Sequence, residues 1–99
     1  MKEVNQEFID NVNWYQNMLK QFKERKKQNI ENRAAFKKHV TFFKSYLKDP
    51  NRNLDGNEIA IVKEHIKELE ESIENSKEIA IQIEENITQI KNILKNNLF

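Results

Sequence analysis

Large apolar side chains recur every seven residues through the first half of this 99-residue chain. Five of the six positions in this ladder are aromatic. They are Phe8, Tyr15, Phe22, Phe36 and Phe43, and Asn29 is the exception. Seven residues make two turns of an α-helix, so these side chains lie along one side of a helix. An apolar seam of this length needs a second helix to cover it.

A second set of residues, four positions after each member of the ladder, completes a heptad repeat, abcdefg. The ladder occupies position d. Position a is filled by Val12, Leu19, Lys26, Arg33, Val40 and Leu47. The repeat does not slip between residues 1 and 47, and no Gly or Pro interrupts it. The pattern predicts one continuous helix over about residues 3–48.

The second half of the chain has the same repeat, built from aliphatic residues. Position a holds Ile59, Ile66, Ile73, Ala80, Ile87 and Leu94, and position d holds Val62, Leu69, Ser76, Ile83, Ile90 and Asn97. Between the halves lie Pro50, the only Pro, and several turn-forming residues. Asp55 precedes Glu58 by three residues, as in a helix capping box. We therefore expect a turn over about 49–55 and a second helix over about 56–97.

These patterns predict an all-α fold, in which residues 1–99 form a single helical domain and an antiparallel hairpin of two long, coiled-coil-like helices. We expect residues whose numbers add to 102 to face each other in this hairpin, because this register matches large side chains with smaller ones. In it, Phe22 faces Ala80, and Phe43 faces Ile59. An alternative is a compact monomer of three or four helices, with both helices broken near 29–32 and 72–76.

Polar residues interrupt the seam at its centre. In the register that adds to 102, Lys26 faces Ser76, and Asn29 and Arg33 lie close by. Polar residues inside a coiled coil lower its stability but can fix the register of the two helices. We expect this polar centre to have that structural role.

Several large apolar residues lie outside the seam, at positions c and g, and form a second stripe. They are Val4, Trp14, Met18, Phe42, Tyr46, Ile61, Ile79 and Ile93. A two-helix hairpin cannot bury both stripes, and monomers seldom expose so much contiguous apolar surface. The second stripe predicts either a homodimer, in which two hairpins form a four-helix bundle, or the docking of a different protein partner.

Charge is distributed unevenly along the chain, although the formal net charge is only +1. Residues 1–50 contain 11 Lys and Arg against 6 Asp and Glu, whereas residues 51–99 contain 6 against 10. Glutamates line the outer side of the second helix, at position f and beside it: Glu64, Glu68, Glu71, Glu74, Glu78 and Glu85. We expect this acidic face to be a solvated surface or a binding surface for a basic partner.

The chain lacks the residues of most catalytic sites. It contains no Cys and one Gly, so it has no thiol nucleophile and no glycine-rich phosphate loop. His39 and His65, even with Glu68, make a poor zinc site, and we expect no metal and no cofactor. Arg33 and His39 form an Arg-x5-His spacing that is similar to the motif of HEPN ribonucleases. That resemblance implies an RNase in which these two residues act on RNA.

We expect a non-enzymatic protein-interaction module, a regulator, inhibitor or adaptor that uses the second stripe and the acidic face. Binding of nucleic acid is an alternative, through the basic run of Lys20, Lys23, Arg25, Lys26, Lys27, Arg33, Lys37 and Lys38. No segment approaches the ~20 apolar residues of a membrane span, and the amino terminus lacks the apolar core of a signal peptide. We therefore expect no membrane partner and a cytoplasmic location.

Overall fold

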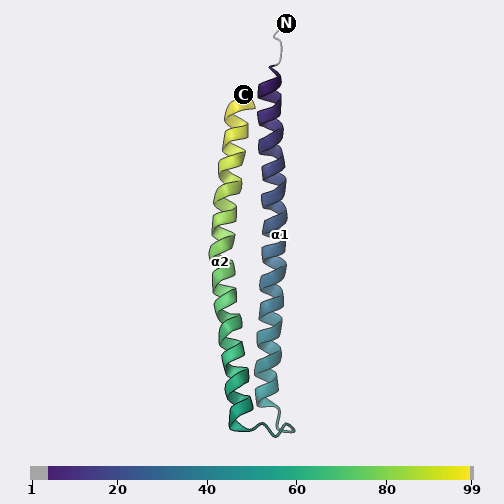
Figure 1. Cartoon of the computed structure of the whole chain (residues 1–99), viewed down its shortest axis with the longest axis vertical. Coiled ribbons are helices and arrows are strands. Elements are labelled where there is room, and N and C mark those ends of the chain that lie inside the picture. The colour runs from purple at the N-terminus through teal and green to yellow at the C-terminus, as the bar shows by residue number, and fades with distance from the viewer. Residues whose placement is uncertain (1–4, 99) are drawn as a thin grey trace. The chain divides into compact units, whose positions relative to one another are not determined.

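The chain folds into two long α-helices in the computed structural model, which describes residues 5–98 (Figure 1). Helix α1 spans Gln6–Lys48 and helix α2 spans Gly56–Leu98, 43 residues each. No strand occurs between residues 5 and 98. The predicted all-α, antiparallel two-helix fold is confirmed. Neither helix is interrupted near 29–32 or 72–76, so the alternative with broken helices is wrong.

Each helix begins after a residue whose side chain accepts a hydrogen bond from the first turn. Asn5 Oδ1 accepts from the backbone N–H of Glu7 at 2.9 Å, and Asp55 Oδ1 accepts from that of Glu58 at 2.8 Å. The first N–H groups of a helix have no partner within the helix, so these caps stabilise both starts. The cap at Asp55 agrees with the predicted start of α2.

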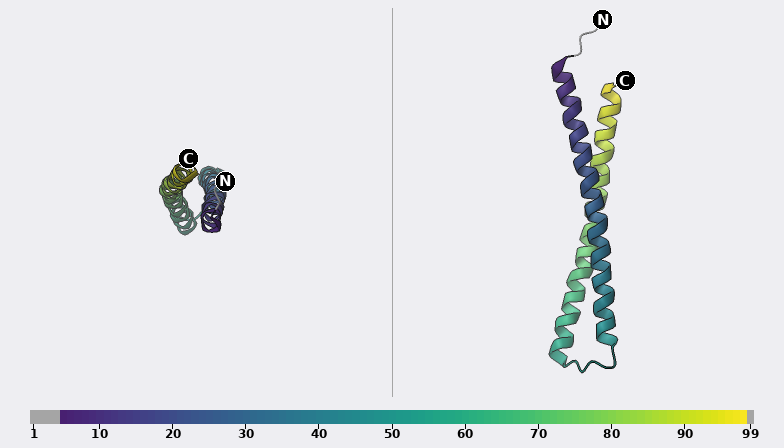
Figure 2. Two further views of the ribbon diagram at one scale, coloured as in Figure 1. Left: turned by 90° about the horizontal axis from the view of Figure 1, so that it is seen from above. Right: turned by 90° about the vertical axis from the view of Figure 1, so that its right-hand side faces the viewer.

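Residues 49–55 form the loop that connects α1 to α2 (Figure 2). Pro50 disfavours the helical conformation for Asp49, which ends α1 at Lys48. Asp49 Oδ1 accepts a 2.9 Å hydrogen bond from the backbone N–H of Asn51, and its Oδ2 lies 3.4 Å from Arg52 Nε. The guanidinium of Arg52 also lies 4.0 Å from the ring centroid of Tyr46. These contacts order the turn.

The chain forms two compact units, each an antiparallel pair of one α1 segment and one α2 segment. Unit 1 contains Met1–Gln28 and Ala80–Phe99, and unit 2 contains Asn29–Ile79. Within each unit, the described side chains at positions a and d are buried or half-buried, except Phe8 and Lys26. The most buried residues are Val40, Ile66, Ile73, Ser76, Ile83, Ile87 and Ile90. All seven occupy positions a or d, which confirms the heptad assignment.

The core of unit 2 shows which residues face each other. Val40, Ile66 and Ile73 pack with Phe36, Phe43, Leu47, Val62 and Leu69. These eight residues can be matched as four pairs of a and d positions whose numbers add to 109, and the cluster does not include Ile59, the predicted partner of Phe43. The predicted register, which adds to 102, is therefore wrong by one heptad. A shift of seven keeps every a residue opposite a d residue, so the repeat alone does not distinguish the two registers.

Contacts between polar and aromatic side chains agree with this register. In unit 2 the rings of Phe43 and His65 meet, and these numbers add to 108. The hydrogen bond from Asn29 to Ser76 joins residues whose numbers add to 105, between the two registers, and does not distinguish them. In unit 1, Lys26 pairs with Glu84, and these numbers add to 110. Phe8 has no facing residue among the described residues in this register. It is 41% exposed, unlike the other members of the aromatic ladder.

Candidate interaction surfaces

The two sides of each helix pair differ in composition. At 100° per residue, positions g and c lie on one side of the seam and positions e and b on the other. In an antiparallel pair, equivalent flanking positions of the two helices lie together. The ion pair between Lys44 Nζ and Glu70 Oε1, at 3.7 Å, joins two e positions. We call the g and c positions the neutral flank and the e and b positions the lysine flank.

Formal charges are concentrated on one of these flanks. Among the helical residues with described side chains, four of 24 g and c positions are charged, against fourteen of 25 e and b positions. The four charged residues of the neutral flank are Glu7, Arg25, Glu58 and Glu68. The rest of the neutral flank consists of Asn, Gln, Ser, His, aliphatic and aromatic residues. Such a surface can be covered without removing many charges from water.

The neutral flank of unit 2 carries an apolar patch next to the interhelical turn. Phe42 and Ile61 are 59% and 62% exposed, and Tyr46 is half-buried beside them. The rings of Phe42 and Tyr46 have centroids 6.3 Å apart, and Phe42 also meets Phe43 edge-on at 5.3 Å. Ile61 faces this part of α1 in the register that adds to 109. These contacts hold Phe42 and Tyr46 in a defined arrangement on the surface.

Histidine and glutamate side chains border the patch of unit 2. The imidazole of His65 packs edge-on against Phe43, with ring centroids 4.9 Å apart. Its Nδ1 lies 3.9 Å from Glu68 Oε2. His39 is exposed on the same flank. Among the described residues, no group of three or more potential ligands could hold a metal ion.

The neutral flank of unit 1 carries a second apolar patch. Trp14 is 57% exposed and meets the ring of Tyr15 edge-on, with centroids 5.0 Å apart. Met18 and Ile93 are half-buried, and both lie near the level of Trp14 in the register. A cavity of about 270 Å³ adjoins the patch and is lined by Phe8, Asn11, Val12, Tyr15, Ile93 and Leu94. Apolar surface is therefore open on this unit as well.

The structure divides the predicted second stripe between the two units. Trp14, Met18 and Ile93 belong to unit 1, and Phe42, Tyr46, Ile61 and Ile79 belong to unit 2. Ile79 is 49% exposed, and Val4 lies outside the described residues. Ile30 and Ile81 are also exposed, at 52% and 60%, but they lie on the lysine flank. The sequence pattern did not single out these two because neither is part of a longer apolar row.

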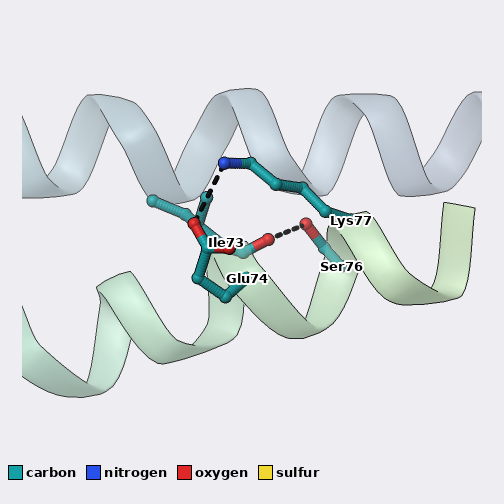
Figure 3. A network of polar contacts seen from close by, with 4 residues as sticks. All are labelled: Ile73, Glu74, Ser76 and Lys77. Atoms are coloured by element: carbon teal, nitrogen blue, oxygen red, sulfur yellow. Dashed lines mark hydrogen bonds and ion pairs between the residues drawn. The ribbon is translucent and has the colours of Figure 1, made fainter.

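The polar centre forms a connected group in unit 2. Asn29 Nδ2 donates a 3.0 Å hydrogen bond to the backbone carbonyl of Ser76, and Asn29 Oδ1 accepts one of 2.8 Å from Arg33 Nη2. Ser76 is 6% exposed, and its Oγ donates to the carbonyl of Ile73 at 2.7 Å (Figure 3). Lys26 does not belong to this group, because its ammonium pairs with Glu84. The centre is thus a structural contact between the helices.

The predicted acidic face lies on the outside of α2. Glu64, Glu71, Glu78 and Glu85 are all exposed at position f, and no ion pair involving them occurs among the described residues. Glu68 lies near His65. Glu74 Oε1 accepts a 2.9 Å hydrogen bond from Lys77 Nζ (Figure 3). Glu74, at position b, belongs to the lysine flank, and Glu68, at position c, belongs to the neutral flank, so neither is in the outer row.

The predicted basic run does not form one surface. Arg33 lies half-buried in the seam, Lys26 pairs with Glu84, and Lys38 is on the outer side of α1. Arg25 lies over the ring of Phe22, 5.2 Å from its centroid. Only Lys20, Lys23, Lys27 and Lys37 lie on the lysine flank. Arg33 and His39, the pair that resembles the HEPN motif, are also on different sides of α1, because Arg33 bonds to Asn29 and His39 is on the neutral flank.

Comparisons with protein-family models, with curated proteins and with solved structures give no significant match. No helix among the described residues is long and apolar enough to cross a bilayer. The candidate binding surfaces are therefore identified from the residues of this chain alone. They are the neutral flank, the lysine flank and the acidic outer row of α2.

Proposed function

We propose that this chain is a protein-interaction module that self-associates through its neutral flank, so that the helices of two copies form a four-helix bundle. The observation that carries the proposal is the segregation of charge: four of 24 positions on the neutral flank are charged, against fourteen of 25 on the lysine flank. Charged residues are depleted from the centres of protein interfaces because their desolvation is costly.

The residue types of the two patches support an interface. Trp14, Phe42 and Tyr46 are the large aromatic residues of the neutral flank, and aromatic residues dominate the binding energy of many interfaces. Trp14 and Phe42 are each more than half exposed in the single chain. Covering them removes apolar surface from water, at about 25 cal/mol for each Å² buried.

The exposed area of the chain supports a large covered surface. The chain exposes 8136 Å². A compact monomer of 11.9 kDa exposes about 5,900 Å². The excess of about 2,200 Å² per chain is within the range that obligate homodimers bury, roughly 1,000–2,500 Å² per chain. No described residue reaches the near-complete burial that core side chains of a compact domain usually have.

A second copy is the partner that this surface fits best. The neutral flank offers few charges for a partner to complement, and an identical flank is equally poor in charge. A net charge of +1 gives two copies little electrostatic repulsion. Twofold dimers are the commonest symmetric assemblies, and packed helical hairpins are a common route to a four-helix bundle. We place this module in the cytoplasm as a regulator, inhibitor or adaptor that acts without a cofactor.

The fluorescence of Trp14 tests the proposal, because this residue is the only tryptophan in the chain. Self-association should bury its indole, so that concentrated protein shows emission at short wavelength and weak quenching by acrylamide. Dilution should move the emission to longer wavelength and increase quenching, while circular dichroism at both concentrations keeps the same helical signal. Emission and quenching that stay independent of concentration, with an indole as accessible as free tryptophan, would contradict the proposal.

A further inference from the structure

The lysine flank is a basic surface made by both helices, including the helix that is acidic in composition. Eleven of the fourteen lysines occupy e and b positions, and all eleven are exposed: Lys20, Lys23, Lys27, Lys37, Lys44, Lys48, Lys63, Lys67, Lys77, Lys91 and Lys95. The flank contains no arginine. This surface differs from the basic run of α1, because five of its lysines come from α2 and several residues of the run are elsewhere.

The carboxylates on this flank are already occupied. It contains three glutamates, and each is in an ion pair: Glu84 with Lys26, Glu70 with Lys44, and Glu74 with Lys77. In unit 1 the flank therefore has five lysines and one glutamate that is paired with a residue of the seam. Between residues 5 and 96, none of the five lysines forms an ion pair. Their positive charge is available to a partner.

The five lysines of unit 1 lie close together along the helix pair. In the register that adds to 109, Lys91 faces residue 18, and residue 18 is two positions before Lys20. Lys95 faces residue 14, and Lys23 and Lys27 continue the group on α1. At about 1.5 Å per residue, the group extends over roughly 20 Å along the helices. A group of this length, contributed by two helices, can contact several phosphates of one nucleic-acid backbone at once.

We propose that the lysine flank binds the phosphate backbone of double-stranded DNA without reading its sequence. Lysine is a point charge with three donors and no acceptor, so it contacts phosphates but lacks the planar fork with which arginine reads guanine. No aromatic residue lies on this flank to stack on the bases of a single strand.

This inference is independent of self-association, because the lysine flank lies across the seam from the neutral flank in each unit. Two copies that join through their neutral flanks leave their lysine flanks exposed. DNA binding by a monomer would therefore contradict the proposed dimer without affecting the inference. A dimer that does not bind DNA would contradict only the inference.

The test is the binding of the full-length chain to a fluorescent DNA duplex of about 30 base pairs, measured by anisotropy between 50 and 200 mM NaCl. Two variants remove lysines of the flank, one on each helix: Lys20→Gln with Lys23→Gln, and Lys91→Gln with Lys95→Gln. A matched control removes two positive charges elsewhere, with Arg25→Gln and Lys38→Gln. Circular dichroism establishes that every variant is folded, and glutamine is a good helix former.

The wild type should bind with an affinity that falls steeply as salt increases. Each variant of the flank should bind about tenfold more weakly at 50 mM NaCl, and its slope of log affinity against log salt should be shallower by up to about 2, because two phosphate contacts are lost. The control should change the affinity less than about twofold, since its residues lie off the flank.

Four results would overturn the inference. The first is the absence of salt-dependent DNA binding by the wild type, and the second is an unchanged affinity after the substitutions on α2. The third is a control variant that binds DNA as weakly as the flank variants do. The fourth is stronger binding to an RNA duplex or to polyglutamate than to DNA. An effect confined to the α1 variant would assign DNA binding to the basic run of that helix alone.

Discussion

Asn29 connects the two helices of unit 2, because its side-chain amide donates a 3.0 Å hydrogen bond to the backbone carbonyl of Ser76. Asn29 interrupts the aromatic ladder, and its Oδ1 also accepts a hydrogen bond from Arg33. A polar residue at a seam position fixes register at a cost in stability. We expect Asn29→Leu to raise the free energy of unfolding by about 1 kcal/mol, which is several degrees in Tm. A thermal melt measures this, and a lower Tm would show that the hydrogen bonds stabilise more than an apolar seam.

The heptad repeat was sufficient to predict the two helices, the turn and the residues of the seam. Each of these depends on local spacing and on a few turn formers such as Pro50 and Asp55. The register was not predicted correctly, because a shift of one heptad keeps every a position opposite a d position. The structure selects the register in which Arg33 and Asn29 lie near the small, buried Ser76. Size matching between Phe22 and Ala80 did not identify this register.

The candidate surfaces were predicted less completely than the fold. The second stripe was visible in the sequence because Trp14, Phe42 and Ile61 stand out at helical spacing. The lysine flank was not visible, because its members are split between a basic helix and an acidic helix. Only the antiparallel pairing brings e positions such as Lys44 and Glu70 to the same side. The net charge of each half of the sequence does not show how the charged residues are distributed between the two flanks of the helix pair.

Disulfide formation between introduced cysteines tests the register, since the chain has no cysteine of its own. Val40→Cys with Leu69→Cys places the two thiols in a facing pair of the register that adds to 109. Val40→Cys with Val62→Cys places them in a pair of the register that adds to 102. Mild oxidation should cross-link the first variant rapidly, and faster migration on a non-reducing denaturing gel than on a reducing one reports the bond within the chain. Faster cross-linking of the second variant would restore the rejected register.

Phe8 and Phe43 belong to the same ladder but should contribute unequally to stability. Phe43 packs in the core cluster of unit 2, whereas Phe8 is 41% exposed and has no facing residue among those described. We expect Phe43→Ala to lower the free energy of unfolding by roughly 2 to 3 kcal/mol, and Phe8→Ala by less than about 1 kcal/mol. Urea denaturation of both variants measures the difference. Equal losses would mean that Phe8 is covered by another part of the protein.

The Asp55 cap should contribute to the stability of α2. Its carboxylate accepts a 2.8 Å hydrogen bond from the N–H of Glu58, which has no partner within the helix. We expect Asp55→Ala to lower the free energy of unfolding by about 1 kcal/mol. Asn53→Ala, in the same connection, is the matched control and should have little effect. A loss no larger than that of the control would show that α2 starts without this cap.

Molar mass from light scattering after size exclusion tests most directly whether the neutral flank joins two copies. Trp14→Glu with Phe42→Glu places charges on the neutral flank, and Ile30→Glu with Ile81→Glu is the control, because these isoleucines are similarly exposed on the lysine flank. The wild type and the control should have twice the 11.9 kDa mass of the chain, and the neutral-flank variant should be a folded monomer. A wild type of 11.9 kDa, or a control that dissociates as readily as the neutral-flank variant, would contradict the proposed interface.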